Sequence, residues 1–355
     1  MLKKSKLFMV SMVTVLSLGL LAGCGTNTAN SQSGKTAAAN GTAAVKKVKI
    51  GFSLPTLKEE RYQKDRDEFV KKASELGAEV LVQAANNDEN LQKSQVENLI
   101  TQGINILVLD PQNAASAADL VDAAHKANIK VISYDRLIKN SDVDLYISFD
   151  NVKVGELQGK FITEKVPKGN YFVFAGAPTD NNATLFKQGA MKFIQPLVDK
   201  GDIKIKYDQP VKDWQPEEAL KMAENALTAN HNDVQAILAP NDGTAGGIIQ
   251  ALAGQKLDGK VVVTGQDAEL AAIKRIIAGT QSMTVYKNVK TLAAKAAEVA
   301  VQMAQGQNVS APAKVNNAKI DVPSVLLEPV VVTKDNIDKE LIDSDWFTKE
   351  QVYGK

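Results

Sequence analysis

Short apolar runs alternate with longer amphipathic segments along most of this chain. The first such pair is an apolar run over residues 48–54 and a helix over 59–76, in which Tyr62 and Phe69 share one face and which Gly77 ends. The same pattern predicts further strands at 79–83, 104–109, 130–134 and 145–149, and further helices at 89–102 and 115–127. Because buried strands that alternate with amphipathic helices pair in parallel, with helices on both faces, the pattern predicts an α/β fold.

The alternation starts again after residue 151. It predicts helices at 152–165, 182–197, 216–229, 244–253 and 269–278, and strands at 171–175, 203–209, 236–239 and 260–264. A strand at 281–286, an alanine-rich helix at 289–305 and a strand at 325–332 follow. A chain of 355 residues is long enough for two ordinary domain cores, so we expect two lobes, each with its own sheet.

Residues 130–151 connect the two lobes and contain the first candidate site residues. The predicted strand 130–134 is followed directly by Asp135 and Arg136. Open α/β sheets present ligand-binding groups at the carboxyl ends of their strands, so these two side chains are candidate ligand contacts. The alternative is a strand that simply ends on polar residues. The next strand, 145–149, leads into the second lobe, so this stretch is also expected to act as a hinge.

The N-terminal residues differ from the rest of the chain. Three lysines precede an apolar run over 7–22, which is followed by Gly23 and Cys24, the only cysteine. This pattern predicts a lipoprotein signal peptide over 1–23 and a lipid on Cys24; the alternative is a secretory signal or membrane helix with an incidental cysteine. Small polar residues over 24–45 predict a flexible tether, or a disordered segment without a spacing role.

Charge and residue inventory exclude several classes of function. A net charge of +1, without a basic face, argues against a nucleic-acid partner. The two histidines, His125 and His231, are far apart in sequence, and no phosphate-binding loop, metal-ligand spacing or dinucleotide fingerprint is present. We therefore expect no enzyme activity, no cofactor and no metal.

Seven short segments carry a more specific signal: 60–67 (ERYQKDRD), 133–136 (SYDR), 146–151 (YISFDN), 180–183 (DNNA), 241–242 (ND), 265–268 (GQDA) and 284–287 (TVYK). With the signal and tether, they resemble the substrate-binding proteins of ABC sugar importers of the ribose and galactose class, in particular the D-xylose-binding branch. The resemblance extends from about residue 46 to the C-terminus. It implies the type I periplasmic binding protein fold, with two doubly wound parallel-sheet lobes joined by a three-strand hinge. It assigns 46–150 and 284–320 to the N-terminal lobe, and 151–283 and 321–355 to the C-terminal lobe.

The resemblance also implies a monosaccharide site. A pyranose has flat C–H faces and a ring of hydroxyl groups, so it needs aromatic plates and planar polar groups around its edge. The implied ligand-binding residues are the plates Tyr62 and Trp214, the acceptors Asp135 and Asp267, and the polar residues Arg61, Arg136, Asn182, Asn241 and Lys287. Three cations against two carboxylates favour an uncharged ligand. Tyr62 stands where D-xylose-binding relatives carry Trp, which leaves the preference among pentoses and hexoses open.

Several of these residues have a structural alternative. Arg61 can form a solvated pair with Asp65, one helical turn along. Asn241 and Asp267 can cap helices, and Trp214 can serve packing alone. The residues expected only to cap, support or pack are Asn181, Asp242, Gln266 and Trp346.

The function implied is that of a lipid-anchored protein on the extracytoplasmic face of the cell membrane, attached through Cys24. It is expected to be a monomer that captures D-xylose or a related monosaccharide by closure of its lobes and delivers it to an ABC permease. The alternative is a sugar sensor that presents another pentose or hexose to a sensor kinase or chemoreceptor. A repressor of the lactose-repressor type shares the two-lobed core, but it needs an N-terminal helix-turn-helix, where this chain has a signal and a tether.

Overall fold

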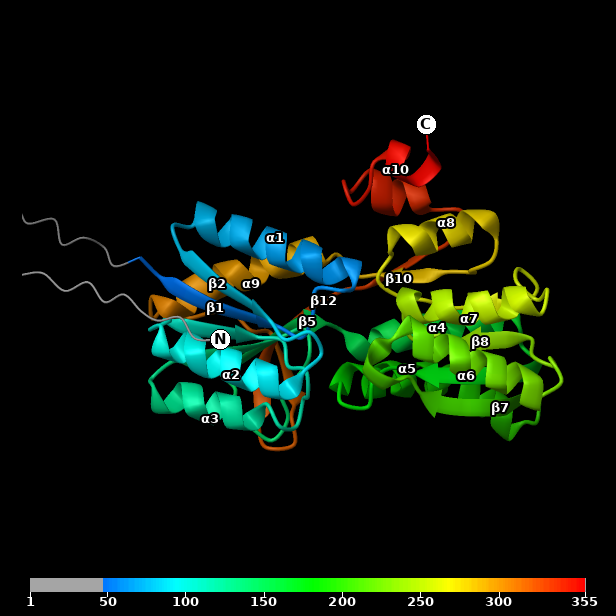
Figure 1. Cartoon of the computed structure of the whole chain (residues 1–355), viewed down its shortest axis with the longest axis horizontal. Coiled ribbons are helices and arrows are strands. Elements are labelled where there is room, and N and C mark those ends of the chain that lie inside the picture. Colours follow the sequence, from blue (N-terminus) through cyan, green and yellow to red (C-terminus); the bar gives the residue numbers. More distant parts are fainter. Residues whose placement is uncertain (1–46, 355) are drawn as a thin grey trace, which may run out of the picture. The chain divides into compact units, whose positions relative to one another are not determined.

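The computed structural model describes residues 47–354. The predicted signal peptide, Cys24 and the tether lie outside the described residues. Within them, the chain forms a seven-stranded sheet, a four-stranded sheet and a two-stranded sheet, with helices between the strands (Figure 1). This confirms the predicted α/β class with two parallel sheets. No helix in this part of the chain is long and apolar enough to cross a bilayer.

The first lobe is built on the seven-stranded sheet, whose order is β11-β12-β5-β4-β3-β1-β2. Its strands are β1 (Lys49–Leu54), β2 (Glu79–Ala84), β3 (Ile106–Leu109), β4 (Lys130–Tyr134), β5 (Leu145–Phe149), β11 (Ala313–Asn316) and β12 (Asp321–Leu327). All neighbours pair in parallel except β11, which lies antiparallel at one edge. Sequence reasoning missed β11, a four-residue edge strand that is too short to show a clear period.

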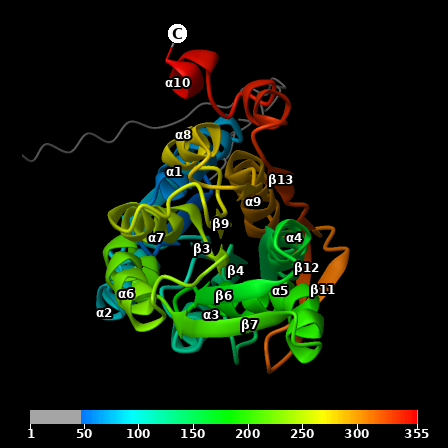
Figure 2. The same cartoon turned by 90° about the vertical axis from the view of Figure 1, so that its right-hand side faces the viewer.

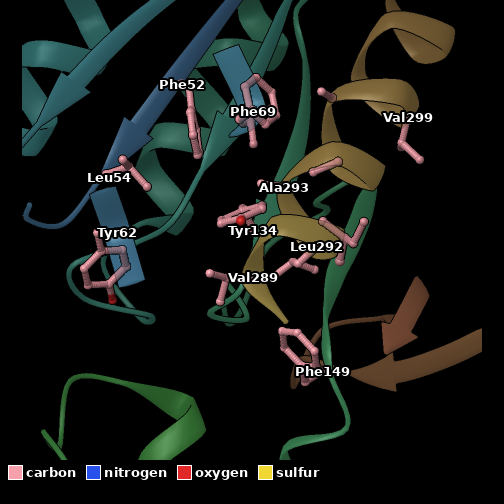
Figure 3. Packing of buried hydrophobic residues seen from close by; sticks show 14 of the residues in the cluster. Phe52, Leu54, Tyr62, Phe69, Tyr134, Phe149, Val289, Leu292, Ala293 and Val299 are labelled. Atoms are coloured by element: carbon pink, nitrogen blue, oxygen red, sulfur yellow. The ribbon is translucent and has the colours of Figure 1, made fainter. Parts of the chain in front are cut away.

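Helices cover both faces of this sheet. They are α1 (Glu60–Glu75), α2 (Glu89–Thr101), α3 (Ala118–Lys126) and α9 (Val289–Ala304). Successive side chains of β3 alternate between the faces: Ile106 and Val108 pack in the cluster of α1 and α9, and Leu107 and Leu109 in that of α2 and α3. Figure 3 shows the first cluster, with Tyr62 at its edge and the Tyr62 hydroxyl turned away from the other side chains.

The second lobe is built on the four-stranded parallel sheet, in the order β7-β6-β8-β9. Its strands are β6 (Gly169–Ala175), β7 (Ile203–Pro210), β8 (Ala236–Leu238) and β9 (Val262–Val263), and its helices are α4 (Asn151–Lys165), α5 (Asn181–Asp199), α6 (Pro216–Ala229) and α7 (Asp242–Gly254). A 3-10 turn, η1 (Lys212–Trp214), follows β7. Helices α4 and α5 pack closely because Gly155 has no side chain; a Cβ there would lie 1.9 Å from the carbonyl oxygen of Phe186.

The remaining elements lie outside these two sheets. They are α8 (Leu270–Ala278), the antiparallel pair β10 (Thr284–Tyr286) and β13 (Val330–Val332), a π-helical turn η2 (Asp338–Ile342) and α10 (Lys349–Tyr353). Helix α10 lies next to α8 in both views (Figure 1 and Figure 2). As predicted, Trp346 packs: its ring centroid lies 5.1 Å from that of Tyr286, and its Nε1 donates to the carbonyl oxygen of Ala268 at 3.0 Å.

The third connection between the lobes differs from the expected one. The single predicted strand 325–332 is two strands, β12 and β13, separated at Glu328 and Pro329, because proline has no N–H to donate to a ladder. Strand β12 pairs with β5 along Ser324–Leu327. Residues 321–327 therefore belong to the first lobe, and the chain leaves that sheet after Leu327 rather than at residue 321.

Candidate functional site

One pocket gathers the polar and aromatic side chains that sequence reasoning singled out. It has an empty volume of about 360 Å³, counting the part open to solvent. All nine predicted ligand-binding residues line it. The lining residues are Glu59, Arg61, Tyr62, Asp135, Arg136, Asp180, Asn182, Phe186, Trp214, Asn241, Gln266, Asp267 and Lys287.

The first lobe contributes the first turn of α1 and the end of β4. Arg61 and Tyr62 lie in that turn, and Asp135 and Arg136 follow β4 directly. The backbone of Asp135 is left-handed (φ 55°), a conformation that Asp tolerates better than most residues. Its carbonyl oxygen accepts a hydrogen bond from the Tyr146 hydroxyl at 2.9 Å. The turn after β4 thus holds Asp135 and Arg136 at the carboxyl end of a parallel strand, as expected.

The second lobe contributes two helix N-termini and η1, which ends at Trp214. Asp180 is the N-cap of α5, where it accepts from the backbone N–H of Asn182 at 2.8 Å. Asn241 is the N-cap of α7, and its Oδ1 accepts from the backbone N–H of Thr244 at 3.0 Å. Asn241 is therefore both a helix cap, which was the structural alternative, and part of the pocket wall.

The segments that join the lobes supply an ion pair. Asp267 follows β9 in the chain, and Lys287 follows β10. Lys287 Nζ lies 3.2 Å from Asp267 Oδ1, with only 2% and 7% of the two side chains exposed. Asp267 has φ 95°, and its backbone N–H donates to the carbonyl oxygen of Val285 at 2.8 Å. Asp267 therefore does not act as the N-cap of α8, which is Glu269.

Arg61 connects two carboxylates inside the first lobe. It lies 3.1 Å from Asp65 through Nη2 and 3.1 Å from Asp135 through Nη1. The pair with Asp65 is present, but it is buried rather than solvated. Burial raises the pKa of Asp65 to about 6, although Arg61 opposes this. Burial would also raise the pKa of Asp135, but the charges of Arg61, Lys287 and Arg136 outweigh it and hold that pKa below its usual value.

Polar contacts of Arg136 and Asn182 cross between the lobes inside the pocket. Arg136 Nε lies 3.0 Å from Asp180 Oδ2, and Asn182 Nδ2 donates to the carbonyl oxygen of Asp135 at 3.1 Å. Burial raises the pKa of Asp180, although the charge of Arg136 opposes the shift. The pocket wall is therefore continuous from one lobe to the other.

Several buried polar atoms of the pocket have no hydrogen-bond partner in the protein. Four are acceptor oxygens: Glu59 Oε2, Asp135 Oδ1, Gln266 Oε1 and Asp267 Oδ1. Two are donors, the indole Nε1 of Trp214 and Nε of Arg136. Asp267 Oδ1 and Arg136 Nε each lie in an ion pair, with Lys287 and with Asp180, so three acceptors and one donor remain without any polar partner. Buried polar groups are normally hydrogen-bonded, so this set is complementary to a ligand that donates more hydrogen bonds than it accepts.

Aromatic rings form part of the wall. The rings of Trp214 and Phe186 meet edge to face, with centroids 6.3 Å apart. Tyr62 is buried, its ring lies 4.9 Å from the Arg61 guanidinium carbon, and its hydroxyl accepts from Arg136 Nη2 at 2.8 Å. Tyr62 thus lines the pocket and also orients a candidate ligand-binding arginine.

Sequence reasoning missed three lining residues and gave a fourth, Gln266, a supporting role only. Phe186 follows Asn182 by one helical turn, so the helical period placed both on one face of α5. Asp180 precedes the predicted helix at a capping position, which brings it next to Asn182. Glu59 precedes α1, and no sequence pattern marked it.

Comparisons with known proteins agree with this architecture. The family model described as "Periplasmic binding protein domain" matches residues 50–308. A "D-xylose-binding periplasmic protein" from Escherichia coli is 54% identical over 311 residues, which cover 88% of this chain and 94% of that protein. A protein of the same description from Haemophilus influenzae is 52% identical over 312 residues, with the same coverage of both chains. The solved structure of a carbohydrate transporter solute-binding protein from Chloroflexus aurantiacus, in complex with D-glucose, superposes with a TM-score of 0.81 at 36% identity, covering 85% of this chain and 97% of that one.

Proposed function

Because the chain belongs to the periplasmic binding protein domain family, we propose that it captures D-xylose outside the cytoplasm and delivers it to an ABC permease. The chain is a sugar-binding protein of the ABC-transporter type and not an enzyme. The choice of D-xylose is supported by two relatives that are more than half identical and are described as D-xylose-binding periplasmic proteins.

The observation that carries the proposal is the set of unpaired polar atoms in the pocket. Three buried acceptor oxygens and one indole N–H, none of them in an ion pair, meet in a pocket that Trp214 and Phe186 also line. A neutral sugar has several hydroxyl donors and apolar C–H faces, so it satisfies both the acceptors and the rings. A phosphate or carboxylate would bring further acceptors against these three unpaired oxygens, which disfavours an anionic ligand.

Closure of the two lobes around the sugar is the proposed mechanism. Asp135 and Arg136 come from the first lobe, and Asn182, Trp214 and Asn241 come from the second. A sugar that touches both sets binds the closed arrangement better than an open one, and this difference shifts the population towards closure. A wrong epimer leaves a buried polar group unpaired, which costs about 1–3 kcal/mol for each group.

The proposal includes a lipid anchor on Cys24, supported by the apolar run before it and by the small residues next to it. Metabolic labelling with a radioactive fatty acid tests this part alone. Label in the wild-type chain and none in Cys24→Ser is the expected result, and label that persists in Cys24→Ser contradicts it.

Calorimetric titration of the purified full-length protein tests the ligand. We expect D-xylose to bind with a dissociation constant in the micromolar range or below, about −8 kcal/mol or stronger, and ribose, arabinose, glucose and galactose to bind more weakly. Tighter binding of another of these sugars would keep the sugar-capture mechanism and overturn the choice of D-xylose. Absence of binding by all five would overturn the sugar assignment.

A further inference from the structure

The indole of Trp214 rests directly on the backbone of Gly176, the residue after β6. A Cβ built on Gly176 would lie 1.9 Å from Cη2 of Trp214, 2.3 Å from Cζ2 and 2.4 Å from Cζ3. The φ of Gly176 lies outside the left-handed region, so its backbone conformation does not require glycine. Space for the indole ring is therefore the reason for glycine at this position.

The backbone that carries Trp214 is fixed close to Gly176. In η1, Asp213 and Trp214 both have left-handed conformations, with φ 49° and 57°. Just before this turn, the backbone N–H of Val211 donates to the carbonyl oxygen of Ala175 at 2.9 Å, which ties the turn to the end of β6. Such paired left-handed residues persist only where the surroundings hold them. The loop is therefore poorly able to withdraw if the space behind the ring is filled.

Trp214 and Gly176 line different cavities. Trp214 lines the candidate sugar pocket, whereas Gly176 does not. Gly176 instead lines a neighbouring cavity, together with Pro178, Ala183 and Pro210. An atom added to Gly176 would therefore reach the sugar pocket through the ring of Trp214, which it would displace.

We propose that Gly176 is a positioning residue for sugar binding, which sets the position of the Trp214 indole in the pocket wall. This inference rests on the proposed function and extends it to a residue that does not touch the ligand. In Gly176→Ala, the Cβ–Cη2 distance has to grow from 1.9 Å to at least the 3.4 Å of ordinary van der Waals contact. The ring has to shift or tilt to open that distance, so the wall of the sugar pocket changes shape and every pyranose loses affinity.

A double-mutant cycle with Trp214→Phe tests the proposal, because phenylalanine lacks Cη2, Cζ2 and Cζ3. In the wild-type background, Gly176→Ala is expected to weaken D-xylose binding by roughly 10- to 100-fold, the range of an overpacked site. In the Trp214→Phe background, the same substitution is expected to change the affinity by less than about threefold. The matched control is Gly254→Ala, whose Cβ would meet no atom within 4 Å, and it is expected to bind as the wild type does.

Two outcomes of the cycle would overturn the proposal: wild-type affinity in Gly176→Ala, or an equal loss in both backgrounds. If Gly176→Ala does not fold, the cycle is measured on the unfolding midpoint. Recovery of the midpoint by Trp214→Phe supports the proposal, and failure to recover overturns it.

Tryptophan emission of the ligand-free protein separates this proposal from the proposed function. Trp214 and Trp346 are the two tryptophans of the chain. We expect Gly176→Ala to change the emission in the wild-type background and not in the Trp214→Phe background, where only Trp346 remains. Unchanged emission in both backgrounds would refute the displacement of the ring. Absence of D-xylose binding by the wild type would instead refute the proposed function alone.

Discussion

Asp267→Asn tests the sugar site at a residue that has two separable roles. Asp267 Oδ1 has no hydrogen bond in the protein, which leaves it free to accept from a sugar hydroxyl. The same oxygen lies 3.2 Å from Lys287 Nζ, and both side chains are almost fully buried. Asparagine keeps the shape of the side chain and removes its charge, so the substitution removes a strong acceptor and half of an ion pair together.

The two roles predict effects of different size. A hydrogen bond to a charged group contributes about 1.5–3 kcal/mol, so D-xylose affinity should fall by roughly 10- to 150-fold. Removal of one partner from a buried ion pair destabilises a protein by about 3–5 kcal/mol, and this is an upper limit here. The reason is that the charge of Lys287 also acts on Asp135 and Asp180, which remain.

The double variant Asp267→Asn/Lys287→Met separates binding from stability. Replacement of both charges by groups of similar volume is often neutral, so the free energy of unfolding should return towards the wild-type value. Sugar affinity should remain low, because a neutral amide oxygen still replaces the charged acceptor. Calorimetry measures the affinity, and urea denaturation measures the stability of the ligand-free protein. Wild-type affinity in Asp267→Asn would refute a ligand contact, and recovered affinity in the double variant would show that the single variant lost binding through its fold.

Three further predictions follow from buried groups. Burial raises the pKa of Asp242 to about 7, so the folded form binds this proton more tightly than the unfolded chain does. The associated stability, up to about 4 kcal/mol, is fully present below the unfolded pKa of about 4 and is lost as pH rises from there through about 7. Thermal unfolding should show this fall in the wild type and a smaller one in Asp242→Asn; equal slopes would contradict it. Tyr62→Phe removes the acceptor of Arg136 Nη2 and should weaken D-xylose binding about 3- to 10-fold by calorimetry, whereas unchanged affinity would exclude a role in orienting that arginine. Gly159→Ala would place a Cβ 2.4 Å from the carbonyl oxygen of Ala190 and should destabilise the protein by about 1–3 kcal/mol in urea denaturation, whereas an unchanged midpoint would show that α4 and α5 separate easily.

The order of strands and helices could be predicted because it depends on the spacing of apolar residues within each short segment. Strands β4 and β5 have the bounds that the apolar runs indicated, and α6 begins at Pro216, a favoured first helical position. The third connection between the lobes differs from the prediction, because its position depends on the pairing of β12 with a distant strand. Residues 321–327 join β5, which lies more than 170 residues earlier in the chain, and no local pattern specifies that partner.

The conformation of η1 could not be predicted either. Asp213 and Trp214 adopt left-handed backbones, which polar loop sequences seldom indicate for tryptophan. The close approach of the indole to Gly176 depends on tertiary packing between β6 and the turn after β7. The sequence indicated a ligand-binding role for Trp214. It did not indicate that the indole packs against Gly176.

The charge balance of the pocket shows most clearly what the folded arrangement adds to the residue inventory. The sequence indicated three cations against two carboxylates, a slight positive excess that argued only weakly for a neutral ligand. Folding brings Glu59 and Asp180 to the same wall, so the three cations face four carboxylates. Each cation already pairs with a carboxylate: Arg61 with Asp135, Arg136 with Asp180, and Lys287 with Asp267. No full positive charge therefore remains for an anion, whereas unpaired carboxylate oxygens remain for hydroxyl donors, and for this reason the same site is expected to select a neutral sugar over a sugar acid or a sugar phosphate.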